Sequence, residues 1–367
     1  MDRTAQPTMA QHRVEVTGGV DTHKDTHTAA TIDSAGRVLG SAQFPASALG
    51  YRMLLAWLRS FGALAMVGVE GTGAYGAGLA RYLREHDVTV VEIDRPDRKT
   101  RRWQGKSDPV DAEAAARAAL SERRTGTPKF RDGGVEALRA LRVARRSAVQ
   151  QRADAARQIK NLIVTAPEGV RTMLRHLKDK DLLAICAGFR PSLDQAGDPV
   201  TATKIALRSL ARRHRDLGQE IDELDELIAP LTQEINPALT KLNGVGPDVA
   251  GQLLVTAGDN PDRLRSEAAF AMLCGVAPLP ASSGRTHRHR LNRGGVRAAN
   301  AALYRIVLCR LRWDQRTRAY MERRTKEGLS KKEIIRCLKR FVAREIYQAL
   351  LTPGTTCNTV ERLTTTA

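Results

Sequence analysis

The apolar and polar positions in the first third of the chain predict strands alternating with helices. Apolar runs at 14–20, 26–32 and 37–44, separated by polar turns, are typical of an antiparallel meander. The amphipathic and wholly apolar segments that follow predict a helix at 48–61, a buried strand at 63–69, a helix at 74–86, a buried strand at 88–93 and a helix at 109–120.

This order of elements predicts a mixed α/β domain. Three antiparallel strands followed by alternating helices and parallel strands is the order of an RNase H-like domain. We assign this domain to residues 13–128 and regard residues 1–12 as a disordered polar tail.

Residues 129–236 are predicted to form a helical, coiled-coil spacer. We expect one Ala/Arg-rich helix from 134 to about 180 and, after a break at 191–199, a second helix at 203–235. In the second helix a three-four spacing marks the seam of a coiled coil at 207, 210, 214, 217, 221, 224, 228, 231 and 235. So regular a seam favours self-association, although it does not separate an intramolecular helix pair from a dimer.

The remaining residues predict a mainly α C-terminal domain at 237–352, with helices at 296–312 and 331–351 and a Thr-rich tail at 353–367. An apolar helix end, then Gly244-Val245-Gly246, then a helix opening at Pro247 is typical of a helix-hairpin-helix. In that motif Gly244 and Gly246 let backbone N–H groups approach phosphate without reading sequence. A plain helical hairpin is the alternative.

Composition narrows the choice of partner. The 367 residues include 59 Lys and Arg against 40 Asp and Glu, a net charge of +19, which predicts a polyanionic partner. Nothing resembles an apolar span of about 18 residues or a secretory segment, so we expect a cytoplasmic, nucleoid-associated protein with nucleic acid rather than membrane as its partner. The scattered cysteines fit a reducing compartment, and 4% aromatic residues argue against base stacking as the main binding mode.

Four acidic residues are candidates for a metal site. Asp21 and Glu70 each end a predicted apolar strand, and Asp108 and Asp111 lie three apart at the start of the 109–120 helix, on one side of it. In an RNase H-like domain these three places converge. Because clustered carboxylates raise each other's pKa, they need cations, and Mg²⁺ or Mn²⁺ suit oxygen ligands. Two ions about 4 Å apart can activate an attacking oxygen and stabilise a leaving one.

Each acid also has an ordinary structural interpretation. Asp108 before Pro109, with an acid at the third position, is a common way to start a helix. Asp21 could form a turn after its strand. Residues 70–73, Glu-Gly-Thr-Gly, could cradle phosphate but lack the lysine of a Walker loop.

Basic residues predict nucleic-acid contacts in two further places. Arg142 and Arg145 belong to a run of cations on the 134–180 helix, which either grips a phosphate backbone or is a solvated face. The second place is the loop containing Ser283 and Gly284, where a hydroxyl would lie beside bound phosphate among the cationic residues Arg285, His287, Arg288, Arg290 and Arg293.

Several motifs between residues 14 and 352 resemble the Asp-Glu-Asp-Asp transposases of the IS110 family and its IS1111 subgroup. The most specific is Lys-Ser-Asp108-Pro-Val-Asp111-Ala. The others are Gly-Val-Asp21-Thr-His-Lys, Val-Glu70-Gly-Thr-Gly, Leu-Asn-Gly-Val-Gly-Pro, Gly-Val-Ala-Pro, a Ser-Gly and Gly-Gly-Val-Arg. Residues around Asn300 depart from the Arg-rich pattern of the family, which puts local DNA contacts in question.

The resemblance implies a RuvC-like catalytic domain, a coiled-coil spacer and a transposase domain with a nucleophilic serine. Asp21, Glu70, Asp108 and Asp111 would be ligands of two Mg²⁺ or Mn²⁺ ions, and Ser283 the nucleophile, with Ser282 the adjacent alternative. Family members are similar to recombinases guided by a structured bridge RNA that pairs with donor and target DNA. They are expected to dimerise through the coiled coil and to act as tetramers.

Two other functions fit parts of the pattern. A RuvC-type Holliday-junction resolvase or RNase H-like nuclease would use the same acids, hydrolyse with water and need no serine. An architectural nucleic-acid-binding protein would need neither. The sequence specifies neither the target site nor the guide RNA.

Overall fold

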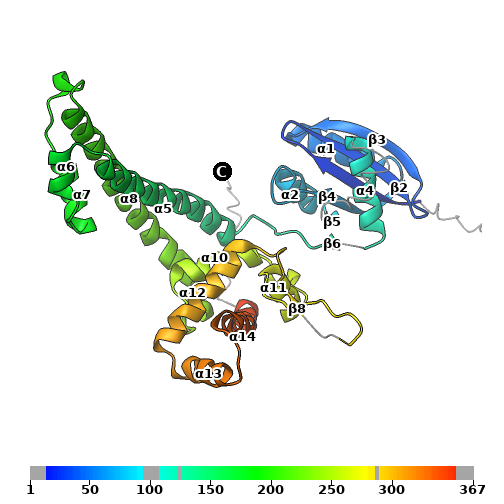
Figure 1. The fold of residues 1–367 in the computed structure, drawn as a ribbon. Helices are drawn as coiled ribbons and strands as arrows, with labels where there is room; N and C mark the ends of the chain where they lie inside the picture. Colours follow the sequence, from blue (N-terminus) through cyan, green and yellow to red (C-terminus); the bar gives the residue numbers. More distant parts are fainter. Residues whose placement is uncertain (1–13, 94–106, 123–124, 286–288, 353–367) are drawn as a thin grey trace, which may run out of the picture. The chain divides into compact units, whose positions relative to one another are not determined.

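The computed structural model describes residues 14–93, 107–122, 125–285 and 289–352, drawn in colour in Figure 1. The chain divides into two compact units. The first contains the residues up to Gly133 together with Ala257–Arg265, and the second contains Gly134–Thr256 and the residues from Ser266 onward. A short segment from the C-terminal half of the sequence therefore belongs to the N-terminal unit.

The first unit is built on a six-stranded mixed sheet with the order β3-β2-β1-β4-β5-β6. β1 is antiparallel to β2, which is antiparallel to β3, whereas β1, β4 and β5 are parallel neighbours and β6 is antiparallel to β5. The strands are β1 (Glu15–Thr22), β2 (Thr26–Asp33), β3 (Val38–Pro45), β4 (Ala63–Glu70), β5 (Thr89–Ile93) and β6 (Thr125–Gly126). The mixed α/β prediction for this part of the chain is confirmed.

The two faces of the sheet carry different helices. Successive side chains of a strand point to opposite faces. Val20 of β1 and Val67 and Val69 of β4 therefore share one face, where they form a core with buried leucines of α1 (Ala48–Arg59) and α2 (Ala77–Glu85). Gly19 and Gly68 point to the other face, which α4 (Asp108–Leu120) covers.

α4 lies unusually close to the sheet because small residues meet small residues there. Its sheet-facing stripe is Ala112, Ala115, Ala116 and Ala119, all buried. A Cβ atom on Gly19 would lie 2.1 Å from the backbone nitrogen of Ala116 and 2.2 Å from the carbonyl oxygen of Ala112. Only glycine allows this approach, so the glycine in β1 fixes where the first turn of α4 can lie.

The segment Ala257–Arg265 supports the edge of this unit. The side chain of Asn260 donates to the carbonyl oxygen of Pro128 at 3.1 Å and accepts from the backbone of Phe130 at 3.3 Å. Arg263 lies 3.6 Å from the Glu92 carboxylate, which also accepts a 2.5 Å hydrogen bond from Thr72. Thr72 follows β4, so this chain of contacts reaches the loop behind Glu70.

The second unit begins with two long helices lying side by side, α5 (Gly134–Val164) and α8 (Pro199–Ile235) (Figure 1). The predicted single helix from 134 to about 180 is wrong. α5 ends at Val164, and α6 (Glu168–Leu174) and α7 (Asp179–Gly188) follow as separate helices. The cause is Pro167, because proline offers no amide hydrogen and disfavours helical geometry in the residue before it.

The predicted coiled-coil seam of α8 packs on α5 of the same chain. Its residues Leu207, Ile221 and Ile228 are buried in this pairing. Near one end of the pair, Leu207 joins Ile159 and Ile163 of α5 and apolar residues of α6 and α7 in one core cluster. The seam therefore has an intramolecular partner, and its regularity alone gives no argument for self-association.

The rest of the second unit is mainly helical. Short helices α9 (Pro237–Thr240), α10 (Pro247–Ala257) and α11 (Glu267–Leu273) precede the two-residue strands β7 (Leu279–Pro280) and β8 (His289–Arg290). The longer helices α12 (Arg297–Trp313), α13 (Gln315–Lys326) and α14 (Lys331–Leu351) follow. α14 starts with a capping box between Ser330 and Glu333, as its sequence favours.

Candidate functional site

Asp21 lies on the face of the sheet that α4 covers. It is two residues beyond Gly19 and pairs in register with Thr28 of β2, and only 8% of it is exposed. Glu70 ends the parallel neighbour β4, two residues beyond Gly68. Because carboxyl ends of parallel strands share one edge of a sheet, and because side chains alternate, both acids belong to the same face at the same edge.

Asp108 and Asp111 extend the alanine stripe of α4 by one turn toward its N-terminus. Residues 108, 111, 112 and 115 follow the spacing that keeps helical side chains on one side. Asp111 is only 3% exposed. The close contact of Gly19 with Ala112 and Ala116 thus brings the first turn of α4, with its acids, over the end of β1.

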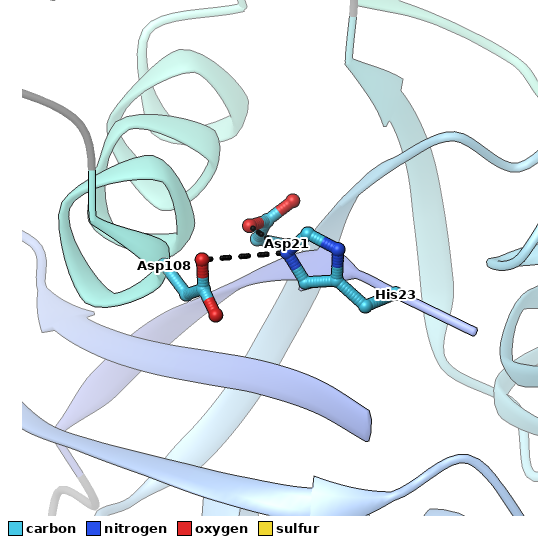
Figure 2. A group of neighbouring side chains, drawn as sticks. All are labelled: Asp21, His23 and Asp108. Carbon is cyan, nitrogen blue, oxygen red and sulfur yellow. Dashed lines mark ion pairs between the residues drawn. The ribbon is translucent and has the colours of Figure 1, made fainter. Parts of the chain in front are cut away.

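Asp21, His23 and Asp108 form a compact group of possible metal ligands (Figure 2). One ligand atom from each lies within 4.8 Å of the others. The His23 Nε2 atom lies 3.2 Å from Asp21 Oδ2 and 3.3 Å from Asp108 Oδ1, so one ring nitrogen is within ion-pair distance of both carboxylates. The structure therefore brings together two acids that are far apart in the sequence.

The charges around Asp21 are mutually repulsive. Burial raises the pKa of its carboxyl group above the ordinary value, His23 opposes that shift, and Asp111 and then Asp108 raise the pKa further. The influence of Asp111 means that its carboxylate lies near Asp21, although it is not part of the three-residue group. Such an accumulation of negative charge is what a bound cation would relieve.

The sequence interpretation assigned no role to His23. The signal was present, because His23 follows Asp21 by two positions, and residues two apart at the end of a strand lie on the same face. The carboxylate oxygens suit hard divalent cations such as Mg²⁺ and Mn²⁺, and imidazole nitrogen suits transition metals. The donor set therefore fits a divalent ion, with Mn²⁺ accepted by both ligand types.

Ser283 is exposed and belongs to the second unit. It lies between β7 and β8, and Gly284 after it has φ = 55°, a left-handed conformation that favours glycine. Arg285 is exposed, Arg290 forms part of β8, and Arg293 follows in the loop before α12. His287 and Arg288 lie outside the described residues, as does Lys106 of the acidic motif.

Arg142 and Arg145 take part in an ion-pair network within the second unit. Arg142 donates at 2.7 Å to both the carboxylate and the carbonyl oxygen of Asp248, and Arg145 donates to Asp225 at 2.5 Å. Arg305 also lies 2.8 Å from Asp248. The guanidinium groups predicted to bind phosphate are therefore engaged by carboxylates, and only 12% of the Arg142 side chain is exposed.

Gly244 and Gly246 occupy the turn before α10. Gly244 has φ = 76°, and a Cβ there would lie 3.3 Å from the carbonyl oxygen of Ile306. A Cβ on Gly246 would have no atom within 4 Å. The first glycine is thus required by the fold of the unit, whereas the second leaves its backbone open on one side.

Comparison with known protein families matches two separate parts of the chain. A transposase model for the DEDD transposases of IS110 matches residues 18–166, and a model described as Transposase IS116/IS110/IS902 family matches residues 236–322. The chain belongs to the IS110 family of transposases. The first IS110 match contains Asp21, Glu70, Asp108 and Asp111, and the second contains Ser283.

A curated relative supports the same assignment. The chain is 31% identical over 124 residues to "Insertion element IS110 uncharacterized 43.6 kDa protein" of Streptomyces coelicolor. The match covers 34% of this chain and 29% of the length of that IS110 protein. Among the described helices, none combines the length and the apolar character needed to span a bilayer.

Proposed function

We propose that this protein cuts and rejoins DNA strands as the transposase of an insertion sequence. The observation that carries the proposal is the meeting of Asp21, His23 and Asp108 at the carboxyl edge of two parallel strands, with Asp111 close enough to raise the pKa of Asp21. An RNase H-like fold for the first unit is part of the proposal, and the order of its five longer strands supports it.

We assign the metal site to Asp21, Glu70, Asp108 and Asp111, with His23 as an additional ligand or a positioning residue. Divalent cations bound there would stabilise charge on the reacting phosphate and favour the deprotonated form of an attacking hydroxyl. The chain itself supplies the position: β1 and β4 fix Asp21 and Glu70, and the close packing of α4 fixes the other two acids. His23, held between two carboxylates, restrains their side chains.

Ser283 is the proposed nucleophile. Its Oγ attacks the phosphorus, an Oγ–P bond forms, and the P–O bond to the departing strand breaks, leaving that strand with a hydroxyl group that takes up the proton. The phosphoserine keeps the bond energy, so a hydroxyl of the other strand can later displace the serine. The exposure of Ser283 and the cationic side chains that follow it support this role.

The partners in this proposal are donor DNA, target DNA and a structured guide RNA. A net charge of +19 and an aromatic content of 4% agree with binding through the backbone while an RNA supplies sequence specificity by pairing. Dimers or tetramers of the chain, in which the serine of one copy works with the acids of another, would complete the synaptic complex.

A water-driven resolvase or nuclease is the competing function, because the acidic cluster could work without a serine. Recombination should be measured in cells between a plasmid carrying the complete element and a target plasmid. We expect Ser283→Ala and Asp21→Asn each to reduce the product by at least about a thousand-fold, as loss of a nucleophile does.

The matched control is Ser282→Ala, which should retain the activity of the native protein. Native protein captured on denaturing gels should carry DNA on a serine, and Ser283→Ala should not. Cleavage by Ser283→Ala at the native rate would establish the resolvase. Full recombination activity of Asp21→Asn would contradict a metal-dependent reaction at this site and would favour an architectural role for the protein.

A further inference from the structure

The second unit contains a cavity of about 620 Å³ beside the hairpin β7–β8. One wall is the loop 275–278 with residues 289–293, and the other is one side of α14. The α14 wall follows helical spacing, with Glu333, Arg336, Cys337, Arg340 and Phe341 on one face. The volume lies within the range of about 300–1,000 Å³ that holds small ligands.

The walls of this cavity are held by specific contacts. Asn300 donates from Nδ2 to the carbonyl oxygens of Cys274 and Gly275 at 3.0 Å and accepts at 2.8 Å from Lys339. A Cβ on Gly295 would lie 2.2 Å from the backbone nitrogen of Gly275, so two loops touch through glycine. Asn300 thus anchors Lys339 to the wall.

The cavity carries an excess of positive charge. Arg290, Arg293, Arg336 and Lys339 line it, against Glu333, which the capping box of α14 engages. Within the described part of the chain, no carboxylate lies at ion-pair distance from Arg290, Arg293 or Arg336. Burial and then Arg336 lower the pKa of Lys339, which agrees with cations gathered close together.

An aromatic pair forms part of the same cavity. The rings of Tyr320 and Phe341 meet edge to face, with centroids 5.6 Å apart and planes at 83°. Phe341 is 46% exposed, although it lies on a helix whose other face is buried. A chain with few aromatic residues therefore places an exposed ring among arginines, the combination that binds unstacked bases of single-stranded nucleic acid.

We propose that this cavity holds one unstacked nucleotide of the DNA strand on which Ser283 acts. Its phosphate would lie against Arg290, Arg293 and Arg336, and its base against the ring of Phe341. DNA is the favoured ligand because the cavity and Ser283 share one hairpin: Arg290 pairs with Leu279, and Ser283 lies in the loop between their strands. The choice of DNA rests on the proposed function.

Photocrosslinking tests the site directly. The probe is a single-stranded DNA of mixed sequence with one 5-iodo-2′-deoxyuridine, irradiated on the full-length protein in EDTA so that no cleavage occurs. Iodouracil couples to aromatic side chains that stack on it. We expect the adduct on peptides containing Tyr320 or Phe341. Adducts confined to other peptides, or none on a complex that forms, would overturn the proposal.

Variants make the test quantitative. Phe341→Leu keeps an apolar side chain and should weaken binding of the same probe at least about five-fold, the lower end of what stacking one base contributes. Arg336→Gln should lower the slope of log affinity against log salt by about 0.7, one phosphate contact. The control Trp313→Leu removes a 70% exposed ring that does not line the cavity and should change neither.

The remaining experiments distinguish DNA from RNA as the ligand, and they separate the cavity proposal from the proposed function. An RNA probe of the same sequence with 5-iodouridine should crosslink less at the cavity, and a crosslink from RNA alone would overturn the assignment to DNA. If Phe341→Leu binds as tightly as the control while Ser283→Ala abolishes recombination, the cavity proposal fails and the proposed function stands. If DNA crosslinks to the cavity while the Ser283→Ala variant still recombines, the cavity binds a nucleotide and the proposed role of Ser283 fails.

Discussion

One carboxylate in each unit, Asp21 in the first and Asp248 in the second, has surroundings opposite to those of the other. In the first unit burial, and then Asp111 and Asp108, raise the pKa of Asp21, and His23 lies within ion-pair distance of Asp21 and Asp108. In the second unit Asp248 is only partly buried, and Arg142, Arg145 and Arg305 surround it. Burial raises the pKa of Asp248, and the three arginines together outweigh burial and bring it below the ordinary value.

This difference distinguishes an acid whose counter-ions belong to the chain from the acids that we propose bind a cation. Asp248 stabilises the fold as an ion, because its partners are present in the chain. Burial, and then Asp111 and Asp108, raise the pKa of Asp21, so keeping the Asp21 carboxylate ionised in this position costs stability. A costly arrangement that close helix packing nevertheless enforces is best explained by a ligand that supplies positive charge.

The largest effect is expected from a substitution that disrupts the close packing of α4 on β1, which brings the acids together. Gly19→Ala places a Cβ about 2 Å from the backbone of α4, so the helix must move. We expect the first unit to lose at least about 3 kcal/mol, the upper range for overpacking, together with all recombination activity. The control is Gly169→Ala, where a Cβ meets nothing within 4 Å, and thermal unfolding should show no loss. Equal stability of the two variants would contradict the packing argument.

The next effect removes a paired acid. Asp248→Asn leaves Arg142 buried without its counter-ion, and we expect a loss of about 3 kcal/mol at pH 7. Because the folded pKa of Asp248 is below its unfolded value, the stabilisation is present above about pH 4 and disappears as the pH falls through the folded pKa. Native and variant unfolding curves should therefore converge once the pH is below the folded pKa of Asp248.

The exposed pair of Asp216 and Arg215 supplies the control, and Asp216→Asn should cost less than about 0.5 kcal/mol. A difference between native protein and Asp248→Asn that grows toward low pH would contradict the assignment of Asp248 as a stabilising ion.

A smaller effect of opposite sign is expected at Asp21. Asp21→Asn removes a charge that its neighbours repel, so without metal the variant should melt higher by about 4 °C, or about 1 kcal/mol. Saturating Mn²⁺ should raise the melting temperature of native protein but not of the variant, since only native protein binds it tightly. Asp25→Asn makes the same charge change at an exposed position and should show neither effect.

The smallest effect on stability is expected at Ser283. The residue is exposed, so Ser283→Ala should change the unfolding free energy by less than about 0.5 kcal/mol while removing the DNA adduct. Loss of activity through unfolding would show as a lowered melting temperature. A clear destabilisation would mean that Ser283 has a structural role.

The sequence predicted the first unit well because its elements follow simple periodicities. Every predicted strand from 14 to 93 has a counterpart, and the helix that carries Asp108 and Asp111 begins at Asp108, one residue before the predicted start at Pro109. The prediction that the acids converge came from the RNase H-like order of elements, because spacing alone does not place a helix over a strand. Gly19 and the alanines of α4 are the physical reason, visible only in three dimensions.

The second unit was predicted less well because its residues contact partners that are distant in the sequence. The run of arginines on α5 looks solvent-exposed in sequence, yet Arg142 finds Asp248 more than a hundred residues away. Likewise, the apolar spacing of α8 does not indicate which helix packs against it. The cavity residues of α14, Phe341 among them, meet the residues around β8 only through tertiary packing, which no local sequence pattern encodes.

The most direct test of the account is anomalous diffraction from crystals of the protein soaked in Mn²⁺. The central claim is that the acids of β1, β4 and α4 share a divalent cation. We predict an anomalous peak about 2.1 Å from carboxylate oxygens of both Asp21 and Asp108. Manganese bound only elsewhere, with these two side chains free of metal, would contradict the claim.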